Sequence, residues 1–550
     1  MEIRDGSGRE TSCGGRRSLA VERRQGRVAW LLPAVWWLAP AAALAAAAPA
    51  PPEKAPRAPE PVIRVVVAQG VDPTTLDPHN HEETPAYNVL QNIYETLLER
   101  DEKLQIVPLL AESYRALNPT TWEFKIRRGI HFHNGEPVDA AAVKFSLDRL
   151  VDPALRMKQA PNFKLIERVE VRDPSTVRII TRSPYPTLDA QFAIRGNIVP
   201  PRYFRQHDAA HVARNPVGSG PFKFVRWRKD EEVVLEAYQI YWRGAPAVRT
   251  VTFKPIPETS TRVAALQTGE VDIAVNIPPH LVPALQRDPR VRVSRAPSVR
   301  TIFLPIYTVK DGKPIAHPVA DVRVRRAMLH AVDVDAIIRD VLEGQGVRTP
   351  TILTERHFGF DPSVRPAPLD PERARRLLAE AGYPNGLDLV LNSPDGRYIK
   401  DKEVAEAVAG QLGKVGIRTV VRTFEWATYL NKMVYVHAAD PLYLIGWGNT
   451  TWDADRTYYP FLHSGEIFAN YATPAMDKLL DEAQVGMDPK RRRELYAQVA
   501  RLLLEEVPIL PLYQQMDLYG VNRRLQWEAR SDERLEMRTV RLAPGADDRR

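Results

Sequence analysis

A short polar and aromatic segment near residue 450 offers the best candidates for ligand binding. In LIGWGNTTWDADRTYY, the apolar residues end a predicted strand, and a glycine then lets the chain turn into a loop. Loops at strand ends often carry binding groups on a rigid scaffold. The candidates in this loop are Trp447, Asn449, Thr450, Trp452 and Asp453. The same pattern also fits two core tryptophans and an aspartate that caps a turn.

A second group of candidates lies in the acidic stretch HNHEETP. It consists of Glu82, Glu83 and Thr84. The two carboxylates could hold cationic groups of a ligand through charge-assisted hydrogen bonds. A solvated acidic loop is the competing interpretation.

Residue types that ligate metals surround this second group. Asp77, His79 and His81 stand beside Glu82 and Glu83, and two histidines at i and i+2 with carboxylates could bind Ni²⁺ or Zn²⁺. A metal site is therefore one hypothesis for this stretch. A further pair, His131 and His133, shares one face of a predicted strand, but no third ligand is evident for it, so a structural role is expected.

No catalytic motif accompanies these candidates. The chain contains no G-x-S-x-G elbow, no H-E-x-x-H and no S-x-x-K. Its single cysteine, Cys13, precedes the apolar run of the leader, so the mature chain is expected to have no thiol nucleophile and no disulfide. We therefore expect no enzymatic activity and no cofactor.

The elements that must position these candidates alternate between strands and helices. Residues 121–150 are the most informative, because Trp122 and Phe124 alternate with polar residues as in a half-buried strand. Asn134-Gly135 then predicts a turn, since both residues tolerate positive φ. Asp139 is placed to cap a following helix.

The amino-acid sequence of this unit resembles the signature of a known protein family. The matching residues are Phe124, Arg127, Gly129, Phe132, His133, Gly135, Pro137, Val143 and Ser146, whereas Ala141 and Ala142 replace acidic residues usual in the first helical turn. The segments NPVGSGPFKF, RVAALQTGEVDIA, DVRVRRAMLHAVD, ARRLLAEAGYPNG and EEVPILPLY continue the resemblance in order, over roughly residues 62–541. The chain resembles the peptide/nickel/opine class of solute-binding proteins of ABC importers, bacterial extracellular solute-binding protein family 5, which includes dipeptide- and oligopeptide-binding proteins.

The resemblance implies an α/β type II periplasmic-binding fold with two hinged lobes and an extra domain, and a ligand that lies between the lobes. The expected parts are a signal peptide and leader (1–45), a Pro/Ala-rich tether (46–61), lobe 1 (62–95 with 215–305 and 505–541), the extra domain (96–214) and lobe 2 (306–504). The mechanism is binding, closure and delivery to an ABC permease and ATPase complex of the inner membrane rather than chemistry.

The resemblance also suggests roles for the candidate residues. In the family, an acidic residue after Gly-Trp pairs with the amino group of a bound peptide, but that position here falls at or near Thr450. Either Asp453 takes over, or the ligand lacks a free amine. The backbone around Glu82 would pair with an extended ligand as an added strand. Relatives carry Asp-Pro-His without a metal, so no metal is expected at Asp77 and His79.

The ligand class remains open at this point. Short peptides or peptide-like solutes are the first expectation, and glutathione, an opine, a metal chelate or an oligosaccharide are alternatives. A sensor protein that presents its ligand to a receptor would share the same fold.

The leader and the composition indicate export. Arg23, Arg24 and Arg27 precede an apolar run over residues 28–38, and Ala43-Leu44-Ala45 fits a small-x-small cleavage site. No cysteine follows the run for a lipid anchor, so a free, monomeric periplasmic protein is expected. The net charge of +8 is mild for 550 residues, and no basic run is interleaved with aromatic residues, so nucleic acid is not an expected partner.

Overall fold

The computed structural model describes residues 63–546 apart from 311–312, 435–439, 467, 470 and 472. These residues belong to one compact unit. The predicted leader and tether lie outside them. Within the described ranges, no helix combines the length and the apolar character needed to span a bilayer.

A nine-stranded sheet forms the centre of the molecule. Its order is β19 (Ile445–Gly448), β12 (Val291–Pro305), β20 (Ile509–Asn522), β11 (Ile273–Ala274), β1 (Ile63–Gln69), β10 (Val248–Pro255), β9 (Glu232–Ala237) and β8 (Phe222–Arg228), and β15 (Gly346–Arg348) also pairs with β20. Strand β1 is parallel to β10 and β11, and the remaining pairs are antiparallel. The apolar run IRVVVAQ of β1 is largely buried, as expected for a central strand.

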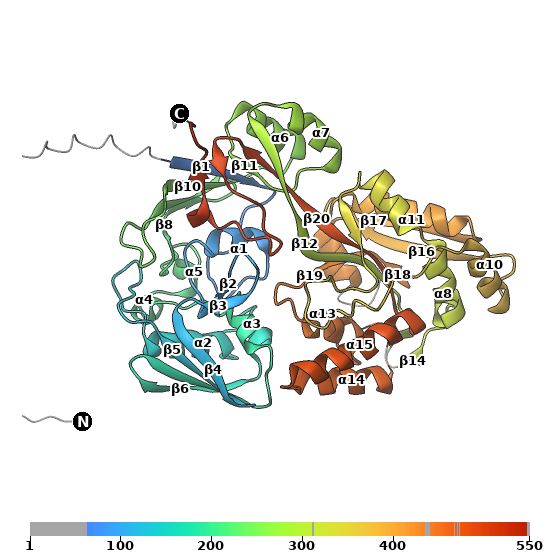
Figure 1. Cartoon of the computed structure of the whole chain (residues 1–550), viewed down its shortest axis with the longest axis horizontal. Helices are drawn as coiled ribbons and strands as arrows, with labels where there is room; N and C mark the ends of the chain where they lie inside the picture. Colours follow the sequence, from blue (N-terminus) through green and yellow to red (C-terminus); the bar gives the residue numbers. More distant parts are fainter. Residues whose placement is uncertain are drawn as a thin grey trace, which may run out of the picture. The chain divides into compact units, whose positions relative to one another are not determined.

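Two long antiparallel strands connect the two halves of this unit. β12 has 15 residues and β20 has 14, and Figure 1 shows them side by side between the part that holds β11 and the part that holds β18. The register of the pair shifts between Pro297 and Thr301 and again between Ile302 and Phe303. Irregularities of this kind bend a strand and increase its local twist.

The extra domain carries the strand–turn–helix unit. Its sheet has the order β4 (Ala111–Asn118), β5 (Thr121–Ile126), β7 (Thr176–Thr181) and β6 (Ile166–Asp173), and α2 (Ala140–Val151) packs against β6 and β7. Phe124 is fully buried, and Asp139 accepts a hydrogen bond from the backbone N–H of Ala142 at 2.8 Å. The predicted strand and helix cap are therefore confirmed.

The other half is built on a parallel three-stranded sheet. Its order is β17 (Ile417–Phe424), β16 (Leu387–Pro394) and β18 (Leu442–Tyr443), with the helices α8 (Val322–Ala331), α10 (Pro371–Glu380), α11 (Asp401–Gly413), α14 (Pro474–Val485) and α15 (Pro489–Glu506). Val404, Val408 and Leu412 of α11 are fully buried at helical spacing. Strands β15 and β19 of this half pair with strands of the central sheet, so one sheet runs through both predicted lobes. The boundaries between the lobes stay a prediction.

The strand before the candidate loop differs from the expectation. β19 runs to Gly448, because it pairs with Arg300 to Phe303 of β12. Gly446 therefore does not turn the chain. A Cβ at that position would lie 2.6 Å from Ile302 Cδ1 and 2.7 Å from the Tyr398 ring, so the glycine permits close packing.

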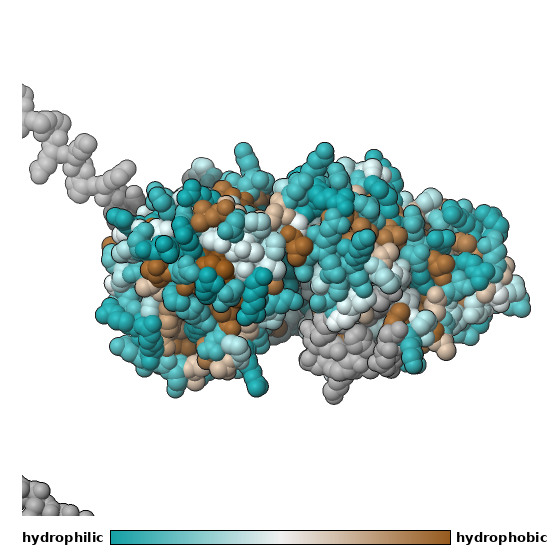
Figure 2. Space-filling view, turned by 90° about the horizontal axis from the view of Figure 1, so that it is seen from below, coloured by the Kyte–Doolittle hydropathy of each residue, from teal (hydrophilic) through white to brown (hydrophobic). Residues whose placement is uncertain are grey.

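The surface shown in Figure 2 is mostly hydrophilic. Hydrophobic side chains on this face form small separate patches between polar residues. Large exposed apolar patches mark association surfaces, and this face shows none of that kind.

Candidate functional site

Arg195 brings the two predicted segments together. Its guanidinium lies 3.4 Å from Thr450 Oγ1 and 3.5 Å from Glu82 Oε2. Glu82 precedes α1 (Thr84–Leu90), Arg195 follows α3 (Leu188–Phe192), and Thr450 follows β19. Residues from both halves of the molecule therefore meet at one place, which we call the cleft.

Arg456 lies in the same cleft. It is half-buried at the start of α13 (Asp455–Leu462), and burial together with the neighbouring charge of Arg195 lowers the pKa of its guanidinium. The neighbouring groups Glu82, Tyr185 and Asp455 raise the pKa of Arg456. Among the described residues, its guanidinium has no hydrogen bond and no ion pair. Neither Arg195 nor Arg456 carried a sequence signal.

Arg100 reaches the candidate loop from the other half of the molecule. It ends β2 (Leu98–Arg100), and it donates hydrogen bonds to the backbone oxygens of Leu104 and Thr451. The side chain is buried, and its Nε has no partner in the part of the chain that the structure describes. These contacts hold the loop against the opposite half.

Hydrogen bonds inside the loop determine its shape. Asn449 donates to Asp453 O and Thr457 Oγ1, and its Oδ1 accepts from both the N–H and the hydroxyl of Thr451. Trp447 donates its indole N–H to the backbone oxygen of Arg456 at 2.8 Å. These residues lock the loop in the conformation that presents Thr450.

Trp452 fills a small apolar cluster beneath the loop. It is 4% exposed and packs with Leu104 and Val299. Its φ of 56° lies in the left-handed region, which costs energy for a bulky residue. The packing with residues of the other half supports this conformation.

The carboxylate of Asp453 forms a bidentate ion pair with Arg492 of α15. The two N–O distances are 2.8 and 2.9 Å, and both residues are buried. Its Oδ1 also accepts from the N–H of Asp455. An amine-binding role for Asp453 stays a prediction, and a ligand ammonium would have to share this carboxylate with Arg492.

The remaining residues of the acidic stretch have local partners. Glu83 accepts hydrogen bonds from the N–H and hydroxyl of Thr74 at 2.7 and 2.6 Å, and Thr84 is the first residue of α1. Because Thr84 is helical, an added strand could pair only with the residues before it.

Asp77 and His79, two of the residues considered as metal ligands, form hydrogen bonds with Arg149. Arg149 forms two hydrogen bonds with Asp77 and one, at 2.7 Å, with His79 Nδ1, while His79 Nε2 bonds to the backbone oxygen of Asn197. Burial and Arg149 lower the pKa of His79 to about 4, so it is neutral at pH 7. The described residues contain no group of three or more ligating side chains suited to a metal ion.

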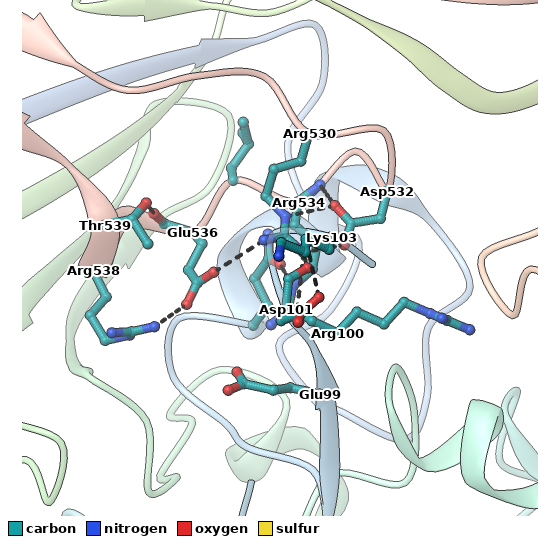
Figure 3. Close-up of polar contacts among 12 residues, drawn as sticks. Glu99, Arg100, Asp101, Lys103, Arg530, Asp532, Arg534, Glu536, Arg538 and Thr539 are labelled. Atoms are coloured by element: carbon teal, nitrogen blue, oxygen red, sulfur yellow. Dashed lines mark hydrogen bonds and ion pairs between the residues drawn. The ribbon is translucent and has the colours of Figure 1, made fainter. Parts of the chain in front are cut away.

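A charged wall borders the cleft. A cavity of about 210 Å³ is lined by Tyr87, Arg100, Ala193, Ile194, Thr450, Asp532 and Arg534. Figure 3 shows that the wall alternates in charge along residues 530–538: Arg530 pairs with Asp532 at 2.7 Å, and Arg538 pairs with Glu536 at 2.7 Å. A second cavity of about 450 Å³ shares four lining residues with the first: Tyr87, Ala193, Ile194 and Arg534.

A second pair of arginines lies near the start of the loop. Arg300 of β12 is paired with Gly448 of β19, and its guanidinium lies 3.4 Å from Glu533 Oε1. Arg397 lies over the rings of Tyr398 and Trp426, at 5.1 and 5.0 Å from their centres. Its guanidinium has no hydrogen bond to any described residue.

Comparison with known proteins places this geometry in a family. The family model for bacterial extracellular solute-binding proteins, family 5 Middle, matches residues 105–469. The glutathione-binding protein GsiB of Escherichia coli (strain K12) is 30% identical over 461 residues, which cover 82% of this chain and 88% of GsiB.

Solved structures share the whole fold. The periplasmic binding protein DppA from Helicobacter pylori, in complex with the peptide STSA, is 25% identical with a TM-score of 0.75, covering 88% of this chain and 98% of DppA. The binding protein MoaA from Agrobacterium tumefaciens R10, in complex with mannopinic acid, is 25% identical with a TM-score of 0.74, covering 88% and 99%. The fold is therefore the predicted α/β type II periplasmic-binding fold, and the chain belongs to family 5 of the bacterial extracellular solute-binding proteins, which serve ABC importers.

Proposed function

We propose that this protein captures a short peptide or a peptide-like solute in the periplasm and delivers it to the permease and ATPase of an ABC importer. The observation that carries the proposal is the contact of Arg195 with both Glu82 and Thr450. These groups come from opposite halves of the molecule, so a ligand at this place touches both.

The relatives support the solute class. GsiB binds glutathione, DppA was solved with the peptide STSA, and MoaA with mannopinic acid. All three ligands are small and carry carboxylate groups. Thr450 and Glu82 are proposed to face such a solute, and Trp447, Asn449, Trp452 and Asp453 to position the loop.

The mechanism is closure of the two halves around the solute. β12 and β20 run through both halves, and the hinge is proposed to lie at their register shifts, where the strands are already bent. A ligand that contacts both halves binds the closed form better than the open form and so shifts the population toward it. The importer then recognises the closed form.

The protein is proposed to act as an exported monomer. The leader and its small-residue cleavage site support export, and the hydrophilic face in Figure 2 fits a monomer. No nucleic acid is involved.

A ligand screen tests the proposal. Native mass spectrometry of protein purified from the periplasm identifies a co-purified solute, and thermal shift over di- to pentapeptides, glutathione, opines and oligosaccharides confirms the class. A ligand at 100 times its Kd adds about 2.7 kcal/mol of stability. A response limited to oligosaccharides would contradict the peptide class, and a chain that binds no solute would contradict the function.

A further inference from the structure

Arg456 places a positive charge in the cleft without a counter-ion of its own. A guanidinium has five N–H donors in a planar fork, and half-burial leaves those of Arg456 only water as a partner. The described residues around it supply no acceptor within hydrogen-bond distance. The largest neighbouring charge is another arginine, Arg195, which repels it.

The contacts of Arg195 do not neutralise the positive charge that it and Arg456 place in the cleft. Its distances to Thr450 and Glu82, 3.4 and 3.5 Å, are at the long limit for a hydrogen bond. The other oxygen of Glu82 already accepts from Asn162 Nδ2 at 2.9 Å. Glu82 thus contacts Arg195 and acts on Arg456 only through its charge, so most donors of both guanidinium groups have no protein partner.

The nearby carboxylates are poorly placed for an amine. Asp453 is held by Arg492 and Asp532 by Arg530. Burial and the charge of Asp453 raise the pKa of Asp455 to about 6, so it holds its proton more strongly than an ordinary aspartate but is still mostly ionised at pH 7. The position where relatives are expected to carry an acid is the neutral Thr450. Apart from Glu82 and Asp455, these carboxylates are paired with arginines, whereas the guanidinium groups of Arg195 and Arg456 have few protein partners.

We propose that the cleft binds an organic acid, with one carboxylate of the ligand held between Arg195 and Arg456 beside the hydroxyl of Thr450. This rests on the proposed function and names its ligand class. Guanidinium groups bind carboxylates through two parallel N–H···O bonds, which fixes the orientation of the ligand. A second pair of arginines, Arg300 and Arg397, lies near the start of the loop and would be the partner for a second carboxylate of the ligand.

Calorimetry on Arg456→Gln tests the assignment. The probes are glutathione, its diethyl ester, mannopinic acid, trialanine, trialanine amide and maltotriose. Acid-bearing probes bind the parent, and Arg456→Gln weakens them by at least about 30-fold, because one partner of a desolvated charge pair is lost. The ester and the amide bind the parent more weakly than their acids and lose little further in the variant.

A matched variant controls for the loss of charge. Arg376 is an exposed arginine of α10, and Arg376→Gln removes the same charge outside the cleft. It leaves the affinity for every probe unchanged. A loss equal to that of Arg456→Gln would overturn the site, since it would reflect only the overall charge.

Melting of the unliganded protein separates binding from structure. Removing a positive charge that is repelled by neighbouring Arg195 leaves the melting temperature of Arg456→Gln unchanged or higher. A lower melting temperature with unchanged affinity would give Arg456 a structural role and overturn the inference.

The two proposals fail in different ways. If trialanine amide binds the parent as tightly as trialanine, or if maltotriose binds the parent more tightly than every acid, the organic-acid inference fails while the solute-binding function stands. If no probe binds the parent and no solute co-purifies with it, both fail.

Discussion

Asp453 is expected to contribute mainly to the stability of the fold, because its carboxylate is already paired with Arg492. Asp453→Asn leaves Arg492 with an uncompensated buried charge, and removing one partner of a buried ion pair costs about 3–5 kcal/mol. Urea unfolding should show this loss. Asp395→Asn is the control, since Asp395 is exposed and surface changes stay within about 0.5 kcal/mol. Unchanged stability with weakened ligand binding would instead support the amine role.

Glu95 makes stability depend on pH. It is 5% exposed and accepts hydrogen bonds from Ser219, Tyr241 and Trp242, and burial raises its pKa to about 7. An unfolded glutamate has a pKa of about 4.3, so between these values the folded state retains a proton that the unfolded state has lost. Stability from this group is complete below about pH 4.3 and is lost as the pH rises to 7, on the order of 3 kcal/mol.

Glu95→Gln should therefore remove this part of the pH dependence. The variant gains stability relative to the parent at pH 8 and not at pH 4, as measured by urea unfolding at both values. The parent keeps other raised carboxyls, including Asp517 with a pKa of about 7, so the slope becomes smaller rather than zero. An identical slope in parent and variant would exclude Glu95 as its source.

At the scale of elements, Gly218 permits the close contact between the segment before β8 and the residues after α1. A Cβ there would overlap the backbone carbonyl oxygen of Ile93, and this oxygen also accepts a hydrogen bond from the N–H of Gly220 at 2.8 Å. The backbone at Ile93 cannot move aside as the end of a flexible side chain could, so the added Cβ would force the two segments apart. Gly218→Ala should therefore destabilise the protein by about 3 kcal/mol, the upper end for overpacking.

Gly410→Ala is the matched change in an open position. Gly410 lies in α11 with nothing within 4 Å of an added Cβ, so alanine should stabilise the helix by up to about 1 kcal/mol. Thermal unfolding of both variants shows whether the effects have opposite signs. A tolerated Gly218→Ala would mean that the two segments can separate without cost.

At the scale of the whole molecule, the leader predicts where a mature, exported chain would begin. The apolar run and the alanines after it predict cleavage near Ala46. N-terminal sequencing of periplasmic material should begin between about Ala45 and Pro51. Full-length protein found only in the membrane fraction would contradict both the cleavage and the free periplasmic form.

The sequence alone determined the local structure and the family. The strand and the capped helix of residues 121–150 follow from side-chain alternation and an aspartate at the helix start, which act over a few residues. The order of the motifs predicted the type II fold, and the structural relatives confirm it. Both candidate segments stand out in the sequence as loops rich in polar and aromatic residues. The structure brings them together at Arg195, and their role in ligand binding stays a prediction.

Only the tertiary structure decided which residues of these segments face the cleft. Asp453 meets Arg492, 39 residues away, and Thr450 meets Arg195, 255 residues away. The chain has 76 lysines and arginines, so no local pattern distinguishes these arginines from those on the surface. Their partners are set by how the two halves pack, and a charge that is ordinary in water becomes a binding group only where packing removes the water around it.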